Sequence, residues 1–384
     1  MKKGTQLLLT SLLCLAGLNA MAERPNIILC MSDDQGWGDV AYNGHPVLRT
    51  PHLDQMSREG IRFDRFYSTS PVCSPTRAAC LTGRHPYRQG VPFANVGKLK
   101  AEEITLPEVL GEQGYATGHF GKWHLGSLTT KTKDGHRGRL GNTATYSPPW
   151  ENGYDECFVA ESGVHTYHIA DNYEKLGTHY WTGLDQMVPA EEISGDDSKL
   201  MMDRALPFIE RASKADIPFL AVIWFHTPHQ PVLSAPPYTD GYNEHKDYYG
   251  CMTAMDEQMG RLRAKLKELG VEDNTMLWFC SDNGPTKVKN SWGSTGGLRG
   301  GKRSLYEGGV RVPGLLIWPQ IIEQPRVVSM PCSTSDYFPT ILDMLGLQLP
   351  DRPYDGISLM PLIKGTMTER PKPLAFESSF TMRE

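Results

Sequence analysis

Three short apolar runs constrain the fold of this chain most strongly, because each one ends directly in polar residues. They cover residues 27–31, 219–225 and 276–280. Runs of this length without polar alternation are typical of strands buried on both faces, as in a parallel sheet covered by helices. Apolar residues at helical spacing separate them and predict helices over residues 50–60, 105–114, 199–214, 249–270 and 336–346. Alternating strands and helices predict an α/β sandwich with a mostly parallel central sheet.

The polar residues that follow these runs predict one shared site. Asp33 and Asp34 follow the first run, His226 the second, and Asp282 and Asn283 the third. In open parallel sheets, ligands bind beyond the carboxyl ends of the strands. Any one cluster could simply start a turn or cap a helix, but that does not explain the repeated Ser-Asp-Asx pattern. The four Asp and Asn side chains offer only oxygen ligands, which suit calcium or magnesium better than zinc or copper.

The amino terminus has the pattern of a secretory signal. Two lysines precede an apolar run, and small residues precede a cleavage position after Ala22, so residues 1–22 are predicted to be removed. The apolar run is too short to span a membrane, and we expect export to the periplasm or the medium without a membrane anchor. The net charge of −5 over 384 residues argues against a nucleic-acid partner.

Cysteine usage points to residue 73. Of eight cysteines, Cys14 leaves with the signal, and no two are spaced two to four residues apart as a thiolate zinc site requires. Cys73 lies at the start of a predicted helix that Ser74 can cap, where the helix dipole favours an anion. Arg77 lies one turn further on the same face. From these residues alone, Cys73 is interpreted as a thiolate nucleophile with a lowered pKa.

The stretch Cys73-Ser-Pro-Thr-Arg77, followed by Leu81-Thr-Gly-Arg84, resembles the signature of the formylglycine-dependent sulfatases of the alkaline-phosphatase superfamily. Thr76 stands where serine is commoner in that family. The similarity runs from residue 24 to about residue 365. It includes four further segments, at residues 121–124, 225–229, 281–284 and 301–313.

The resemblance implies both a cofactor and a mechanism. A maturation enzyme would oxidise Cys73 to formylglycine, and a calcium ion, or magnesium in its place, would bind there. The implied metal ligands are Asp33, Asp34, Cys73 as formylglycine, Asp282 and Asn283. The implied catalytic set is Cys73, Arg77, Lys122, His124, His226 and Lys302. In it, Lys122 and Lys302 hold sulfate oxygens, His226 protonates the leaving group, and His124 assists release of sulfate.

The expected substrate is a sulfated carbohydrate, either a polysaccharide or a glycosaminoglycan. Residues 127–189 show little periodicity and are interpreted as a long insertion of loops, which are usually functional. Within it, His165, His168 and Trp181 are candidates to bind the sugar, next to Lys122, His226 and Lys302 at the sulfate.

Two alternatives remain from the sequence. One is a phosphatase or phosphonate hydrolase of the same superfamily, although Asn283 after Asp282 favours one metal ion over two. The other is an inactive protein that binds sulfated glycans. The resemblance implies an alkaline-phosphatase-like catalytic domain over residues 23–365. Residues 366–384 would then be the start of a small C-terminal antiparallel subdomain that is largely absent.

Overall fold

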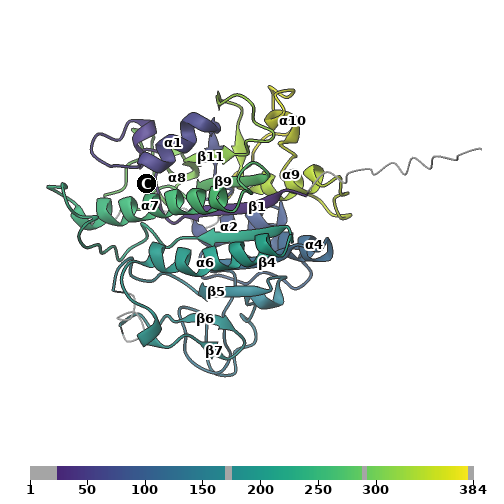
Figure 1. The fold of residues 1–384 in the computed structure, drawn as a ribbon. Helices are drawn as coiled ribbons and strands as arrows, with labels where there is room; N and C mark the ends of the chain where they lie inside the picture. Colours follow the sequence, from purple (N-terminus) through teal and green to yellow (C-terminus); the bar gives the residue numbers. More distant parts are fainter. Residues whose placement is uncertain (1–23, 169–174, 288–291, 379–384) are drawn as a thin grey trace, which may run out of the picture.

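The fold is centred on a ten-stranded mixed sheet, seen in a computed structural model that describes residues 24–168, 175–287 and 292–378 (Figure 1). The strand order is β12-β2-β11-β9-β1-β8-β4-β5-β6-β7. The central parallel strands are β9 (Thr275–Ser281), β1 (Asn26–Ser32), β8 (Phe219–Trp224), β4 (Ala116–Lys122) and β5 (Glu156–Ala160). The flanking strands are β11 (Gly314–Ile317), β2 (Ile61–Phe63), β12 (Arg326–Val328), β6 (Tyr180–Gly183) and β7 (Gln186–Met187).

Helices cover both faces of this sheet, as predicted. One face packs against α1 (Pro51–Glu59), α6 (Asp197–Lys214) and α7 (Lys246–Glu268). The other packs against α2 (Cys73–Thr82), α4 (Leu106–Glu112) and α9 (Tyr337–Met344). Along β1, Ile27, Leu29 and Met31 enter one core, and Ile28 and Cys30 enter the other. This two-sided burial explains why the strand has no polar alternation.

The shorter elements close the ends of the sheet. Their bounds are η1 (Ala41–Asn43), α3 (Pro86–Gln89), η2 (Pro149–Glu151), η3 (Ala190–Glu192), α8 (Glu307–Val310), η4 (Thr334–Asp336) and α10 (Met360–Ile363). A separate three-stranded sheet consists of β10 (Arg311–Val312), β3 (Phe66–Tyr67) and β13 (Cys332–Ser333).

The prediction for residues 127–189 was wrong, and the sequence predicted only β1, β8 and β9 among the strands. Residues 127–189 are not only loops, because β5 and β6 extend the central sheet from this segment. Strand β4 was not predicted, because its residues Ala-Thr-Gly-His-Phe-Gly-Lys form no apolar run, although six of the seven are buried. The ring of His119 instead packs edge-on against Trp123, Tyr154 and Trp224, which replaces the missing aliphatic contacts.

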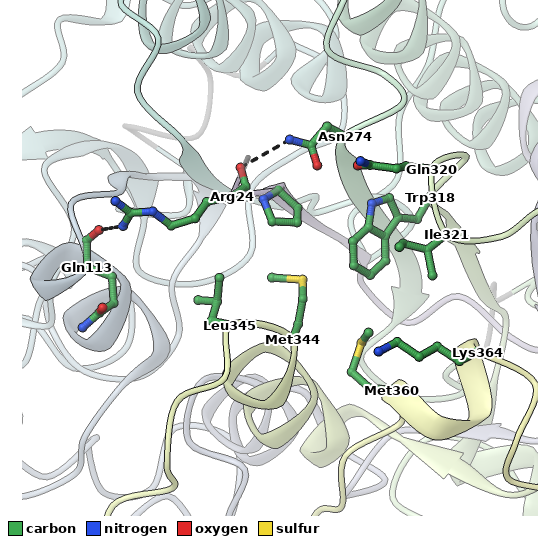
Figure 2. Close-up of a pocket in the computed structure, with 11 residues that line it drawn as sticks. Arg24, Gln113, Asn274, Trp318, Gln320, Ile321, Met344, Leu345, Met360 and Lys364 are labelled. Carbon is green, nitrogen blue, oxygen red and sulfur yellow. Dashed lines mark hydrogen bonds between the residues drawn. The ribbon is translucent and has the colours of Figure 1, made fainter. Parts of the chain in front are cut away.

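The amino ends of the strands surround an apolar cavity of about 600 Å³ (Figure 2). Trp318, Met344 and Met360 line it, with Arg24 and Lys364 among its polar residues. Over the described residues, no helix has the length and apolar character to cross a bilayer. The seven described cysteines are all buried and free of disulfides, and the predicted signal over residues 1–22 lies outside the described part of the chain.

Candidate active site

The carboxyl ends of β1 and β9 bring the four predicted oxygen ligands together. Asp33 and Asp34 directly follow β1, and Asp282 and Asn283 directly follow β9. The backbone N–H of Asp34 donates to Asp282 Oδ1 at 3.0 Å, and Asn283 Nδ2 donates to Asp34 Oδ1 at 2.7 Å. All four residues are buried. The parallel pairing of the two strands therefore places residues 248 or 249 positions apart within one site.

Three cationic side chains face these carboxylates. Lys122, the last residue of β4, places Nζ 2.5 Å from Asp33 Oδ2. The Arg77 guanidinium, on α2, donates through Nε and NH2 to Asp282 Oδ2 at 3.1 and 2.7 Å. The Arg77 guanidinium is therefore bound to the Asp282 carboxylate, and its effect on residue 73 is electrostatic.

The third cation comes from the loop after β9. Lys302 Nζ lies 2.6 Å from Asp34 Oδ1 and 2.8 Å from Asp34 Oδ2. Three carboxylates and three cations thus form a formally neutral buried cluster. Burial opposes ionisation of Asp33, but Lys122, His229 and Arg77 outweigh it and hold the pKa of Asp33 well below its usual value. Burial and the neighbouring Asp33 raise the pKa of Asp282.

Two buried oxygens in the cluster accept no hydrogen bond. They are Asp33 Oδ1 and Asn283 Oδ1. A buried acceptor without a partner is costly, and both belong to residues that the sequence assigns to a cation. The donor chemistry therefore fits a hard divalent cation held by Asp33, Asp34, Asp282 and Asn283.

Cys73 is the first residue of α2 and is buried beside these charges. Val72, in an extended conformation, precedes the helix, so the predicted cap by Ser74 is wrong. The Ser74 hydroxyl has no hydrogen-bond partner in the described part of the chain. Burial raises the pKa of the Cys73 thiol, although Lys122 and Lys302 oppose that rise. The interpretation of Cys73 as a thiolate with a lowered pKa is therefore wrong.

His124 is buried at the end of the β4 segment, two residues beyond Lys122. Its Nε2 lies 2.7 Å from Oδ1 of Asn95, an acceptor, which fits the tautomer that carries the proton on Nε2. Its Nδ1 is buried and has no hydrogen-bond partner among the described residues. Burial and the charges of Lys122 and Arg137 hold the pKa of His124 well below its usual value. The lowered pKa favours the neutral form of the ring.

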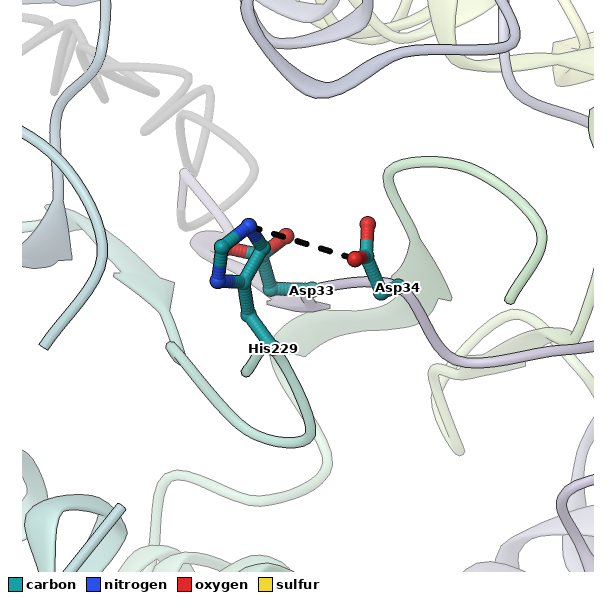
Figure 3. Close-up of side chains that lie close together, drawn as sticks. All are labelled: Asp33, Asp34 and His229. Atoms are coloured by element: carbon teal, nitrogen blue, oxygen red, sulfur yellow. Dashed lines mark ion pairs between the residues drawn. The ribbon is translucent and has the colours of Figure 1, made fainter. Parts of the chain in front are cut away.

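The two histidines that follow β8 lie in different environments. His226 is completely buried, and its Nδ1 lies 3.0 Å from Asp197 Oδ2 on α6; Tyr180 OH donates to the same carboxylate. His229 instead points toward the cluster, and its Nε2 lies 3.9 Å from Asp34 Oδ2 (Figure 3). Ligand atoms of Asp33, Asp34 and His229 all lie within 4.8 Å of one another.

The sequence assigned the leaving-group acid to His226 and gave no role to His229, whose Nε2 lies 3.9 Å from Asp34 Oδ2 in the structure. The available signal was the spacing of the segment itself, His226-Thr-Pro-His229, which contains two histidines after one strand. The backbone N–H of His229 donates to His226 O, forming a tight turn that directs the two side chains differently.

The three predicted sugar-binding residues have different environments. Trp181 is only 4% exposed and its Nε1 donates to Asp134 Oδ2, so it cannot present a ring face to a sugar, and that prediction is wrong. His165 is half-buried in the segment after β5, which approaches the His229 ring at Gly163. His168 is exposed, and its backbone N–H donates to Gly195 O.

Comparisons with known proteins agree with one another over most of the chain. A family model described as Sulfatase matches residues 25–347. N-acetylgalactosamine-6-sulfatase of Canis lupus familiaris is 34% identical over 397 residues, covering 96% of this chain and 72% of the relative. Arylsulfatase A of Homo sapiens is 33% identical over 393 residues, covering 96% of this chain and 73% of the relative.

Solved structures are similar as well. The crystal structure of Ps i-CgsB in complex with k-i-k-neocarrahexaose has a TM-score of 0.81 and 27% identity, and covers 93% of this chain and 80% of that one. PsFucS1 sulfatase from Pseudoalteromonas sp. has a TM-score of 0.72 and 28% identity, and covers 87% and 70% respectively. A phosphonate monoester hydrolase of Agrobacterium radiobacter, with a TM-score of 0.65 and 20% identity over 90% of this chain and 78% of that one, shares the fold.

Proposed function

The chain belongs to the sulfatase family of sulfuric ester hydrolases, and we propose that it removes sulfate from a sulfated polysaccharide or glycosaminoglycan by using formylglycine at position 73 and a calcium ion. The observation that carries this proposal is the neutral cluster of three carboxylates and three cations around residue 73. A divalent cation added to that cluster leaves a net positive site, which favours an anionic sulfate ester.

The metal ligands in this proposal are Asp33, Asp34, Asp282 and Asn283. The oxygens of Asp33 and Asn283 that accept no hydrogen bond support it. When bound, the ion supplies Lewis acidity toward an anionic oxygen, and a hydrated aldehyde at residue 73 supplies a hydroxyl nucleophile. Magnesium fits the same oxygen donors.

Lys122 and Lys302 hold the sulfate group. Both contribute to the electrostatic environment of Cys73, and each is paired with a carboxylate in the cluster. Their charges stabilise the negative charge that shifts among the sulfate oxygens during transfer. Arg77 holds Asp282 in place rather than touching substrate, because its Nε and NH2 both bind that carboxylate.

Proton transfer is assigned to two histidines. His124 Nδ1 acts as a base toward residue 73, and Asn95 holds its ring in the required tautomer. His229 is assigned to donate the proton to the leaving sugar oxygen, since its Nε2 lies 3.9 Å from Asp34 Oδ2 in the cluster. Burial lowers the pKa of this ring to about 4, and a bound anionic sulfate ester favours its protonated form. Expelling an unprotonated alkoxide is costly near neutral pH, so the acid is needed.

We also propose that residues 1–22 direct export to the periplasm or the medium, and that a formylglycine-generating enzyme acts on the Cys73-Ser-Pro-Thr-Arg77 motif. Phosphonate hydrolysis is disfavoured because the similarity to the phosphonate hydrolase, at 20% identity, supports the fold alone.

The test is hydrolysis of sulfated sugars by protein co-produced with a maturation enzyme. The panel contains N-acetylgalactosamine 6-sulfate, carrageenan oligosaccharides and an aryl sulfate, with an aryl phosphonate as the competing substrate. Release of sulfate with turnover well above that of the phosphonate supports the proposal. Binding of sulfated glycans without any turnover in matured protein would favour the inactive binding protein instead.

A further inference from the structure

A cavity beside the cluster has the features of a second carbohydrate site. We propose that it binds the sugar ring next to the one that loses sulfate. The inference rests on the proposed carbohydrate substrate and adds to it a subsite.

The cavity measures about 540 Å³, a volume suited to a sugar ring, and three segments converge on it. Residues 230–232 follow β8, residues 245–248 form the start of α7, and Trp292 lies in the loop after β9. All three segments lie at the carboxyl edge of the sheet, where the cluster lies. Gln230 lines the cavity and directly follows His229, whose Nε2 is 3.9 Å from Asp34.

The floor of the cavity is fixed to the loop that carries the proposed metal ligands. Tyr248 is buried, and its hydroxyl donates to Asp39 Oδ2 at 2.9 Å. The same carboxyl group accepts from the backbone N–H groups of Gly36 and Ser294, both at 2.8 Å. Asp39 therefore joins α7, the loop after β1 and the loop that carries Trp292, so the cavity keeps a fixed position relative to the cluster.

An aromatic pair provides the surface for a sugar. The rings of His245 and Trp292 stack with centroids 3.6 Å apart and planes 17° from parallel. Trp292 is nevertheless 41% exposed, so much of the indole remains open to a ligand. A rigid indole offers a large contact area at low entropic cost and packs well against the C–H face of a pyranose.

The rim of the cavity carries charges of both signs. Lys246 is exposed at the start of α7, next to the stacked pair, and forms no ion pair with any described residue. Two carboxylates lie nearby: Asp247 Oδ1 accepts from the backbone N–H of Ser234 at 3.0 Å, and Glu244 Oε2 lies 3.8 Å from His245 Nε2. The Lys246 ammonium can therefore donate to a hydroxyl or an anionic group of a bound ring, and the two carboxylates can accept from ring hydroxyls.

The test compares a long and a short probe that share one sulfated unit: a chondroitin 6-sulfate tetrasaccharide and N-acetylgalactosamine 6-sulfate. Trp292→Ala should lower kcat/KM for the tetrasaccharide about tenfold through KM, and leave the monosaccharide and an aryl sulfate unchanged. Trp292→Phe should keep most of the wild-type kcat/KM for the tetrasaccharide, because it keeps an aromatic ring at this position. Lys246→Gln should cost about threefold, mainly at low salt. Lys267→Gln, an exposed lysine at the other end of α7, is the matched control.

The failure of this inference differs from the failure of the proposed function. Equal losses on both probes after Trp292→Ala, or no loss on either, would overturn the subsite while sulfatase activity stands. A wild-type enzyme that turns over the monosaccharide at least as well as the tetrasaccharide would also overturn it. If matured protein hydrolyses no sulfate ester, calorimetric binding of the tetrasaccharide to unmodified Cys73 protein still decides the subsite, since Trp292→Ala should weaken that binding about tenfold.

Discussion

The two ends of the central sheet differ in the chemistry that they bury. At the amino end, a cavity of about 600 Å³ is lined mainly by apolar side chains such as Trp318, Met344 and Met360 (Figure 2). At the carboxyl end, three carboxylates and three cations are buried together around Cys73. Buried ion pairs rarely stabilise a fold better than apolar packing does. The charged end is therefore best understood through catalysis, and the apolar end through stability.

The largest expected effect lies at residue 73. Cys73→Ala should abolish turnover of an aryl sulfate, by a factor of at least about 10⁴, because the nucleophile is lost. The melting temperature should change little, since alanine fits a buried, uncharged position. Cys332→Ala, a buried cysteine in β13, is the matched control and should retain activity. Appreciable activity in the Cys73 variant would contradict the assignment of catalysis to the carboxyl end of the sheet.

Removal of the metal ion should have the next largest effect. Chelation should reduce turnover by about 10³ or more, because the electrostatic stabilisation of the transferring sulfate is lost. Calcium should restore turnover and should raise the stability of the folded protein by about 2.7 kcal/mol at one hundred times its Kd. Asn283→Ala, which removes an unpartnered buried acceptor, should reduce the calcium-dependent shift in melting temperature. A shift unchanged in that variant would argue against Asn283 as a ligand.

Within the carboxyl edge, the two histidines after β8 are expected to differ, with His229 serving catalysis and His226 serving stability. His229→Ala should lower kcat about 10²- to 10⁴-fold for a sugar sulfate, and less for an aryl sulfate whose leaving group needs no proton. His226→Ala should instead lower the free energy of unfolding by about 1–3 kcal/mol, because the Asp197 carboxylate loses a buried partner. Kinetics on the two substrates and thermal unfolding distinguish these outcomes. The reverse pattern would return the acid role to His226.

Asn95 should have a smaller, indirect effect through His124. Asn95→Leu removes the acceptor for Nε2–H and should lower kcat about tenfold, the size of one hydrogen bond. Asn95→Asp keeps an acceptor and should keep most activity, and Asn243→Leu, also exposed, serves as the control. Nitrogen-15 spectra of histidine-labelled protein should show His124 protonated at Nε2, with mixed tautomers in Asn95→Leu. An unchanged tautomer in that variant would contradict the positioning role.

The smallest effect on activity is expected at the amino end. Met360→Ala should lower the free energy of unfolding by about 2 kcal/mol, because Met360 is buried beside the cavity, and should leave kcat/KM unchanged. Denaturant unfolding and aryl-sulfate kinetics measure both quantities. A large loss of activity without loss of stability would show that the apolar end also serves catalysis.

The sequence predicted three of the strands that are buried on both faces. The runs that form β1, β8 and β9 are apolar at every inward position on both faces, so they indicated the sandwich and placed Asp33, Asp34, Asp282 and Asn283 at one edge. Strand β4 gave no such signal, because glycine, threonine and histidine pack against large aromatic side chains contributed by other segments.

Side-chain direction was the part of the site that the sequence did not predict. His226 and His229 lie in one short segment, and only the turn between them decides which ring reaches the cluster. Trp181 resembled a sugar-binding residue by type, but it is buried and its Nε1 donates to Asp134, which lies 47 residues away in the sequence. Asn95 belongs to none of the motifs found in the sequence, so its proposed role could be inferred only from its contact with His124 in the structure.

Mass spectrometry of the tryptic peptide spanning residues 66–77, from protein with measured sulfatase activity, tests the central claim most directly. The mechanism predicts that the fraction of peptide with an aldehyde in place of the Cys73 thiol rises in proportion to specific activity across preparations with and without the maturation enzyme. Full activity in a preparation whose residue 73 is entirely unmodified cysteine would contradict it.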